Sequence, residues 1–318
     1  MLKKLVALLL IVFCLIAACS CNEATIDGAS VADTITFTDA LGRTVNVKKN
    51  PERVAALIGS FADVWLLAGG SVCATADDAW DDFGLELPDA VNIGGAHSPS
   101  LEILLSTSPD LVIASASTAS NVEMREVLEN IGITVAYFDV DCFEDYLFML
   151  DICTDITGRK DLYEQNGTNL EKQIATIRST CHNSDPSDDE RKVLLLRAAS
   201  GSVKAKGSSG TILGEMLCDL GCINIADSDS TLLENLSIES IIRQNPYRIF
   251  VVTMGNDTSK AIDNLTKMIN ENTAWSSLEA VKENRVHIMD RKLFNIKPNA
   301  KWAESYEQLS KILLETTK

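Results

Sequence analysis

Two stretches of this chain carry one pattern at a constant spacing. The first is "SLEILLSTSPDLVIAS", residues 100–115, and the second is "SIESIIRQNPYRIFVVT", residues 237–253. The residues that recur are Ser100, Glu102 and Pro109 in the first copy and Ser237, Glu239 and Pro246 in the second. In each copy a serine precedes an apolar helical pattern, a proline ends it, and a buried strand follows. The repeat predicts one helix–strand unit built twice.

The segments around each copy continue the same alternation. Short apolar strand patterns alternate with helical patterns that end at glycine, as in residues 121–132 followed by residues 133–139. This alternation predicts an α/β fold with mostly parallel sheets and helices on both faces. Residues 35–47 alternate apolar and polar residues around Gly42 and predict a hairpin at the start.

A long helical pattern separates the two copies. Residues 159–183 contain no proline and keep helical apolar spacing, with Gly167 as a weak point inside. We therefore expect an N-terminal lobe over residues 35–158, one long connecting helix over 159–183, and a C-terminal lobe over 184–318.

The N-terminus has the pattern of a targeting segment. Lys3 and Lys4 precede an apolar run that is too short to span a bilayer comfortably. The run ends in "IAAC", which looks like the signal for lipidation of Cys19, with Cys21 as an alternative anchor. We expect a signal peptide over residues 1–18, and a flexible tether over 19–34 that holds the protein at the outer surface of the cell membrane.

Charge and cysteine content restrict the partners. The formal net charge is −17, which argues against a nucleic-acid partner. Of the nine cysteines, Cys14 falls in the signal peptide and Cys19 at the anchor. The seven others are an odd number, which argues against a fully paired disulfide framework, and we interpret them as buried apolar thiols.

Five motifs in a fixed order resemble one family, the substrate-binding proteins of ABC importers for iron chelates, heme and cobalamin. They are residues 39–57, 93–115, the connecting helix, 210–226 and 275–290. The resemblance implies two Rossmann-like lobes joined by one long helix, with the ligand in the cleft between them. It also implies a monomer without catalytic residues or a catalytic cofactor, which captures a metal chelate and delivers it to an ABC permease and its ATPase.

The resemblance gives the repeated glutamates a role. In the family, one glutamate on each lobe docks to basic residues of the permease, and by motif position these are Glu102 and Glu239. Carboxylates on rigid lobes can hold arginines bidentately. The alternative is that each glutamate only compensates its helix dipole, a contribution of about 0.3–1 kcal/mol.

Ligands of open α/β sheets lie beyond the carboxyl ends of the strands, so the loops there supply the candidate site. The candidate ligand-binding residues are Phe61, Trp80, His97, Arg197, Lys204, Met254, Arg291 and Phe294. The cations would pair with carboxylates of the ligand, and the aromatic rings would cover an apolar ring. If the ligand is heme, His97 and Met254 are a suitable axial pair. Alternatively, His97 packs in a polar loop and Met254 fills the core.

Other functions stay open at this point. A cobalamin receptor of the same family would favour neutral polar and aromatic groups over these cations. An exported enzyme would need a catalytic motif, and the sequence contains no G-x-S-x-G, H-E-x-x-H or P-loop pattern. A metallocluster scaffold on the same architecture would need cysteines at the cleft.

Overall fold

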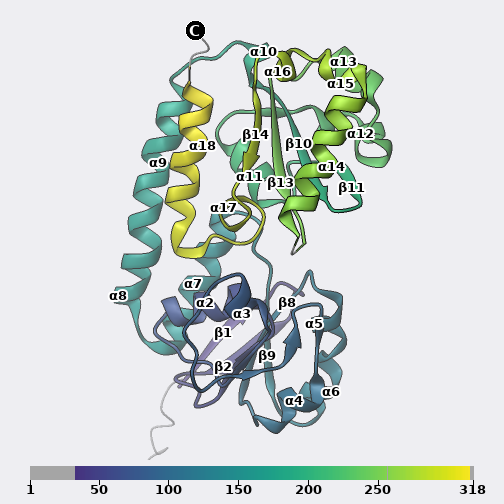
Figure 1. Ribbon diagram of the computed structural model, residues 1–318. Coiled ribbons are helices and arrows are strands. Elements are labelled where there is room, and N and C mark those ends of the chain that lie inside the picture. Colours follow the sequence, from purple (N-terminus) through teal and green to yellow (C-terminus); the bar gives the residue numbers. More distant parts are fainter. Residues whose placement is uncertain (1–32, 256, 316–318) are drawn as a thin grey trace, which may run out of the picture. The chain divides into compact units, whose positions relative to one another are not determined.

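The computed structural model describes residues 33–255 and 257–315 (Figure 1). The expected signal peptide, Cys19, Cys21 and nearly all of the tether lie outside these residues. Contacts divide the chain after Thr34, and the fold below is that of the unit Ile35–Lys318.

The first half forms a five-stranded parallel sheet with the order β5-β4-β3-β8-β9. Its strands are β3 Val54–Ala56, β4 Ala74–Thr75, β5 Val91–Asn92, β8 Leu111–Ser115 and β9 Thr134–Phe138. The expected hairpin is present as β1 Thr34–Thr38 and β2 Thr44–Lys48, and β6 Gly94–Gly95 pairs with β7 Ser98–Pro99. Every residue of β8 is buried, as expected of a strand covered on both faces.

The second half forms another five-stranded sheet with the order β11-β10-β13-β14, to which β12 adds beside β10. Its strands are β10 Lys192–Ala199, β11 Ser202–Lys206, β12 Ile223–Asn224, β13 Arg248–Thr253 and β14 Val286–Met289. Only β11 runs antiparallel within this sheet. The predicted mostly parallel α/β architecture is therefore confirmed.

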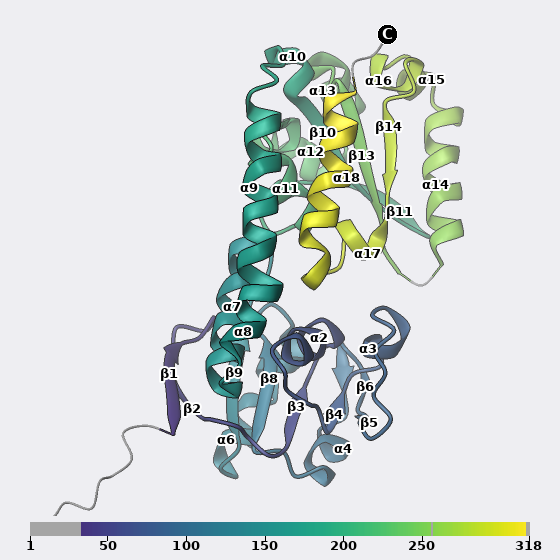
Figure 2. The same cartoon turned by 90° about the vertical axis from the view of Figure 1, so that its left-hand side faces the viewer.

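Helices surround both sheets (Figures 1 and 2). Those of the first half are α2 Gly59–Leu67, α3 Asp78–Asp81, α4 Leu101–Ser106, α5 Ala119–Glu123 and α6 Arg125–Asn130. Those of the middle are α7 Phe143–Thr157, α8 Lys160–Tyr163, the π-helical η1 Glu164–Thr168 and α9 Asn169–His182. Those of the second half are α10 Asp188–Arg191, α11 Ile212–Asp219, η2 Ile225–Ser228, α12 Ser230–Asn235, α13 Ile238–Gln244, α14 Thr258–Glu271, α15 Thr273–Ser276, α16 Glu279–Lys282, α17 Arg291–Phe294, η3 Asn299–Lys301 and α18 Trp302–Leu314.

The connecting segment is helical from Lys160 to His182, but it is not one regular α-helix. A π-helical turn interrupts it at Glu164–Thr168, around Gly167. A Cβ on Gly167 would lie 3.2 Å from the side chain of Leu147 on α7, so glycine allows the two helices to approach closely. The expected weak point is thus a place of tight packing.

The connecting segment also contributes to the core. Ile174 on α9 is fully buried, and α9 lies along α18 (Figures 1 and 2). One cluster of buried apolar residues runs from Phe61 in the first half through Ile174 to Phe250 and Trp302 in the second. Because this core is continuous, the expected lobe boundaries at residues 158 and 183 stay a prediction.

Candidate functional site

The two copies of the repeat fold alike. In the first, the Ser100 Oγ accepts a hydrogen bond of 3.3 Å from the backbone N–H of Ile103 and caps α4. In the second, the Ser237 Oγ accepts a bond of 3.3 Å from the N–H of Ser240 and caps α13. Each helix is followed by a fully buried strand, β8 or β13. The 137-residue spacing therefore corresponds to one helix–strand unit formed twice.

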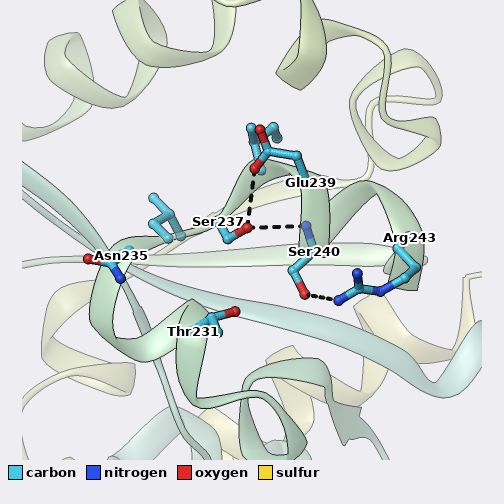
Figure 3. Close-up of a pocket in the computed structure, with 8 residues that line it drawn as sticks. Thr231, Asn235, Ser237, Glu239, Ser240 and Arg243 are labelled. Atoms are coloured by element: carbon cyan, nitrogen blue, oxygen red, sulfur yellow. Dashed lines mark hydrogen bonds between the residues drawn. The ribbon is translucent and has the colours of Figure 1, made fainter.

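Both repeated glutamates are exposed in the first turn of their helices. Glu102 lies on α4 and Glu239 on α13, which Figure 1 shows at opposite ends of the unit Ile35–Lys318. Beside Glu239 is an open depression with a volume of about 640 Å³ (Figure 3), where the Ser237 Oγ donates to the Glu239 Oε2 over 3.2 Å. Both carboxylates are accessible to a partner.

A pocket of about 490 Å³ lies beyond the carboxyl ends of strands from both sheets. This volume is ordinary for a site that binds a small molecule. Segments that follow β3, β8, β13 and β14 line it, together with the end of β10. The lining residues are Ile58, Ser60, Asp82, Phe83, His97, Ser115, Ser117, Thr118, Arg197, Met254, Gly255, Arg291, Asn295, Ile296 and Lys297.

The pocket brings together four of the eight residues predicted from sequence, and the other four lie elsewhere. His97, Arg197, Met254 and Arg291 line it, and both His97 and Met254 are exposed there, so Met254 does not fill the core. Lys204, the neighbour of Arg197 on β11, is exposed but lies outside the pocket lining.

The aromatic part of the prediction needs correction. Phe61 is 0% exposed and Phe294 1% exposed, so neither ring can cover a ligand. Phe61 lies on the core side of α2 and packs edge-on against Phe138, with 6.3 Å between ring centroids. Trp80 on α3 does not line the pocket, whereas Phe83, just after this helix, does. An aromatic residue near a strand end was the only signal in the sequence, and it does not show which way the ring points.

Arg197 lines the pocket and has no counter-ion among the described residues. Its side chain is partly buried, and among the described residues it makes no hydrogen bond or ion pair. Burial lowers the pKa of Arg197, because desolvation disfavours the charged form and no acid compensates. A buried guanidinium without a partner is costly, so a ligand anion at this place would bind favourably.

Arg291, by contrast, is paired. Both of its terminal nitrogens contact the carboxylate of Asp82, with 2.9 Å between Nη2 and Oδ2. The hydrogen bonds that Arg291 donates to Asp82 raise the pKa of Arg291. Arg291 begins α17 in the second half of the chain, and Asp82 follows α3 in the first half. This ion pair therefore connects the two sides of the pocket.

The first half also supplies a perturbed acid next to the pocket. Burial raises the pKa of Asp78 to about 6, and the nearby carboxylates of Asp82 and Asp77 add to the shift. The Asp78 Oδ1 accepts a hydrogen bond of 2.9 Å from the N–H of Gly59 at the start of α2. A Cβ on Gly59 would lie 2.4 Å from the backbone nitrogen of Ala79, so only glycine allows α2 and α3 to meet there.

Lys297 was missed by the sequence interpretation. It lines the pocket, and its ammonium lies 5.9 Å from the centroid of the Phe61 ring. Burial lowers the pKa of Lys297, while the acidic side chains near it, chiefly Asp141 and Asp139, act in the opposite direction. The second half thus brings a cation into acidic surroundings contributed by the first.

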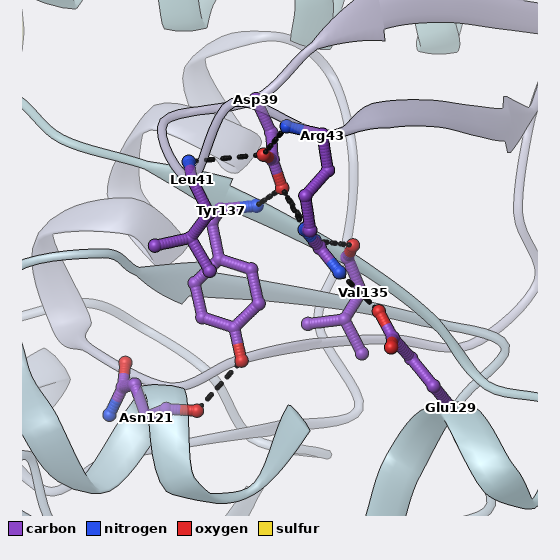
Figure 4. A network of polar contacts seen from close by, with 7 residues as sticks. All are labelled: Asp39, Leu41, Arg43, Asn121, Glu129, Val135 and Tyr137. Atoms are coloured by element: carbon purple, nitrogen blue, oxygen red, sulfur yellow. Dashed lines mark hydrogen bonds and ion pairs between the residues drawn. The ribbon is translucent and has the colours of Figure 1, made fainter. Parts of the chain in front are cut away.

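A network of polar contacts holds the wall of the pocket at the end of β8 (Figure 4). Arg43 in the hairpin pairs with Asp39 and stacks over the ring of Tyr137, with 5.0 Å to the ring centroid. The Tyr137 hydroxyl donates a bond of 2.8 Å to the Asn121 carbonyl, and the Asn121 Oδ1 accepts one of 3.0 Å from the N–H of Ser115. The first hairpin is therefore linked through β9 and α5 to a residue that lines the pocket.

The remaining histidines and the cysteines that the structure describes lie outside the pocket. His182 contacts the Asp219 carbonyl at 2.9 Å, and His287 stacks on Phe250. The six cysteines among the described residues are free: Cys73, Cys142, Cys153, Cys181, Cys218 and Cys222. Cys153 and Cys181 are buried as expected, but Cys218 is exposed, which corrects the interpretation of all of them as buried thiols. Within residues 33–255 and 257–315, no three His, Cys, Asp or Glu side chains form a group that could hold a metal.

Comparison with known proteins identifies the family of this chain. A family model described as periplasmic binding protein matches residues 54–293. The chain belongs to the periplasmic binding protein family, so the resemblance found in the sequence is confirmed. Among the described residues, no helix is long and apolar enough to cross a membrane.

Several relatives share most of the chain's length. It is 23% identical over 285 residues to a Bacillus subtilis protein named uncharacterized ABC transporter substrate-binding lipoprotein YvrC, covering 89% of this chain and 86% of YvrC. It is 25% identical over 299 residues to the Fe(3+)-citrate-binding protein YfmC of the same bacterium, covering 91% and 90%. Among solved structures, that of Staphylococcus aureus IsdE complexed with heme aligns with a TM-score of 0.67 at 17% identity, covering 83% of this chain and 99% of the IsdE chain.

Proposed function

We propose that this chain is an extracytoplasmic lipoprotein that captures an anionic iron chelate in the pocket and delivers it to an ABC permease. Lipidated Cys19, or alternatively Cys21, would anchor it to the cell membrane. It would act as a monomer, without a catalytic cofactor and not as an enzyme. Its partners would be the chelate, the permease and the permease's ATPase.

The observation that carries this proposal is the unpaired guanidinium of Arg197. It lines the pocket, it is partly buried, and it has no acid beside it among the described residues. Lys204 and Lys206 on the adjacent strand add positive potential. Burial lowers the pKa of Lys206, and the nearby charges of Arg197 and Lys204 lower it further. A carboxylate-bearing ferric siderophore or ferric citrate would satisfy this group. The name of the relative YfmC, a ferric-citrate-binding protein, supports the same class.

Heme is the second candidate, and one observation favours it. His97 and Met254 come from different halves of the chain and line the same pocket, where both are exposed. Imidazole and thioether are suitable axial ligands for heme iron, and the heme propionates would meet the cations. Cobalamin is favoured less, because it offers no carboxylate to Arg197.

The exposed glutamates support a docking role. Glu102 and Glu239 occupy the same place in the two copies, and no ion pair within the described residues neutralises either one. Each carboxylate is therefore available to a basic residue of the permease. Compensation of the helix dipole explains one such glutamate, but it does not require the matched placement of two.

Parallel titrations of the full-length chain in detergent test the ligand class. Tryptophan fluorescence would follow Fe(III)-citrate and cyanocobalamin, and the Soret band would follow hemin. Saturable one-to-one binding of Fe(III)-citrate without a response to cyanocobalamin is the expected result. A Soret shift with hemin that is lost in His97→Ala would move the assignment to heme, and binding of cyanocobalamin alone would reject the proposal.

A further inference from the structure

Two side-chain contacts cross from one half of the chain to the other near the pocket, and they differ in accessibility. The Asn299 Nδ2 donates to the Ser60 carbonyl over 2.9 Å and to the Asp63 Oδ2 over 2.8 Å, and Asn299 is fully buried. The Arg291–Asp82 pair lies at the pocket, and both side chains are 23% exposed. A ligand can reach the second contact, whereas it cannot reach the first.

The Arg291–Asp82 pair has the geometry that a ligand carboxylate would adopt. The carboxylate of Asp82 takes both terminal nitrogens of the guanidinium fork, which is the arrangement arginine offers to any carboxylate. The Nε–H of Arg291 is buried and has no acceptor, so the pairing leaves the guanidinium incompletely satisfied. A ligand carboxylate at Arg291 would therefore have to take the two terminal nitrogens that Asp82 occupies.

We propose that Asp82 is an internal competitor for anionic ligands, which holds Arg291 until a ligand carboxylate displaces it. The inference rests on the proposed function, because it assumes that the pocket takes an anionic chelate. Displacement would return the Asp82 carboxylate to solvent beside Asp78 and Asp77, where like charges disfavour it. Breaking the Arg291–Asp82 pair thus costs free energy, which an anionic ligand must recover in order to bind.

The cost of breaking the Arg291–Asp82 pair depends on the charge of the ligand. An anionic chelate replaces one ion pair of Arg291 with another, and it also gains Arg197, which is not paired beforehand. A neutral chelate offers nothing in exchange for Asp82, so it would leave the pair intact and bind through other groups. Asp82 therefore separates ligands by charge, while Arg197 supplies the affinity.

The test compares Asp82→Asn with the wild type in the full-length chain, with Fe(III)-citrate and a neutral ferric trihydroxamate as probes. Asp82→Asn keeps the size of the side chain and removes the charge, so Arg291 becomes free. Affinity for Fe(III)-citrate should rise by about 5- to 30-fold, whereas affinity for the trihydroxamate should change by less than about twofold. Asp81→Asn is the matched control, because Asp81 is the exposed neighbour of Asp82 at the end of α3 and makes no ion pair among the described residues.

A double-mutant cycle assigns the effect to the pair. In an Arg291→Gln background, Asp82→Asn should leave the affinity for Fe(III)-citrate unchanged. Asp82→Ser serves as a second charge-removing variant, and far-ultraviolet circular dichroism confirms that each variant is folded. If Asp82→Asn weakens binding of Fe(III)-citrate, or acts no differently from Asp81→Asn, Asp82 is not a competitor.

A measurement without ligand separates this inference from the proposed function. Hydrogen exchange of residues 291–297 should become faster in Asp82→Asn than in Asp81→Asn, because the contact between the halves is lost. If neither the wild type nor Asp82→Asn binds Fe(III)-citrate, the proposed ligand class is wrong. The proposal that Asp82 competes with the ligand is then wrong as well, even if hydrogen exchange shows that the Arg291–Asp82 pair forms. If binding occurs but exchange and affinity are both unaffected by Asp82→Asn, only the competition is overturned.

Discussion

The two halves of this protein match on their outer surface and differ at the pocket. On the outside, a serine-capped helix presents an exposed glutamate in each half, Glu102 or Glu239. At the pocket, the first half contributes an acid, Asp82, and the second half contributes Arg197 and Arg291. The two halves therefore repeat each other on their outer surface, where a two-point contact would use the match, but not at the pocket.

This difference follows from the physical demands on each surface. A capped helix that precedes a buried strand is fixed by local rules, so the same short pattern gives the same unit in both places. The pocket carries charges of opposite sign on its two sides, which attract each other in the Arg291–Asp82 pair and leave Arg197 unpaired. The predictions below test the match first and the difference afterwards.

The largest effect is expected from reversing both outer charges. Glu102→Lys together with Glu239→Lys should lower iron uptake by about 100-fold or more, because each lysine would face a basic residue of the permease. Uptake of radioactive iron by cells measures this, and ligand affinity should stay unchanged. Each single variant should lower uptake less than the double variant does. If the two halves are equivalent, the two single variants should lower it by the same factor.

Glu126→Lys is the control for these variants. Glu126 is exposed in the first turn of α6, so it has the same relation to a helix dipole but lies outside the repeated unit. Uptake that falls equally in Glu126→Lys would show that helix stability, not docking, is being measured.

A smaller effect is expected from removing the unpaired cation of the pocket. Arg197→Gln should weaken the binding of Fe(III)-citrate by about 10- to 100-fold, because it removes a charge-assisted contact from a partly buried place. Arg197→Lys should retain part of the affinity. Titration by calorimetry gives both values, and Arg243→Gln, a change at an exposed arginine of α13, should bind like the wild type. Equal loss in Arg243→Gln would mean that only the overall charge matters.

The next effect concerns the buried contact between the halves. Asn299→Ala removes both hydrogen bonds and leaves Asp63, a partly buried acid whose pKa burial already raises, without its donor. The free energy of unfolding should fall by about 2–3 kcal/mol in urea denaturation. Asn130→Ala, at the exposed end of α6, should change it by less than about 0.5 kcal/mol. A similar small change in Asn299→Ala would show that the contact does not hold the halves.

The smallest effect is a pH dependence that belongs to one half only. Because the pKa of Asp78 is about 6 in the folded protein and 3.8 ordinarily, the folded state binds a proton more readily. The contribution of Asp78 to stability is therefore most favourable below about pH 4 and is lost as the pH rises through about 6. Asp78→Asn should match the wild type near pH 4 and be more stable at pH 7.5, by on the order of 1 kcal/mol.

Thermal unfolding over this pH range measures the difference between the two proteins. Asp81→Asn, at an exposed acid of the same helix, should follow the wild type throughout. A difference between Asp78→Asn and the wild type that does not depend on pH would contradict the assignment.

The sequence was sufficient for the elements and for part of the pocket. The repeat predicted α4–β8 and α13–β13 because capping and burial depend on neighbouring residues. It also placed His97, Arg197, Met254 and Arg291 near strand ends, and these four line the pocket.

The rest depends on contacts that sequence spacing does not contain. Phe61 and Phe294 are near strand ends, but the packing of their helices turns both rings into the core. Asp82 and Arg291 are 209 residues apart, so nothing local indicates that they pair. Lys297 belongs to the pocket because α17 and η3 place it there, after the last strand has ended.

The most direct test of the central claim is a crystal structure of the protein with Fe(III)-citrate. The account predicts one chelate in the pocket, with a carboxylate within hydrogen-bonding distance of the Arg197 guanidinium and Asp82 separated from Arg291. A chelate bound elsewhere, or a filled pocket in which Arg197 contacts no ligand oxygen, would contradict it.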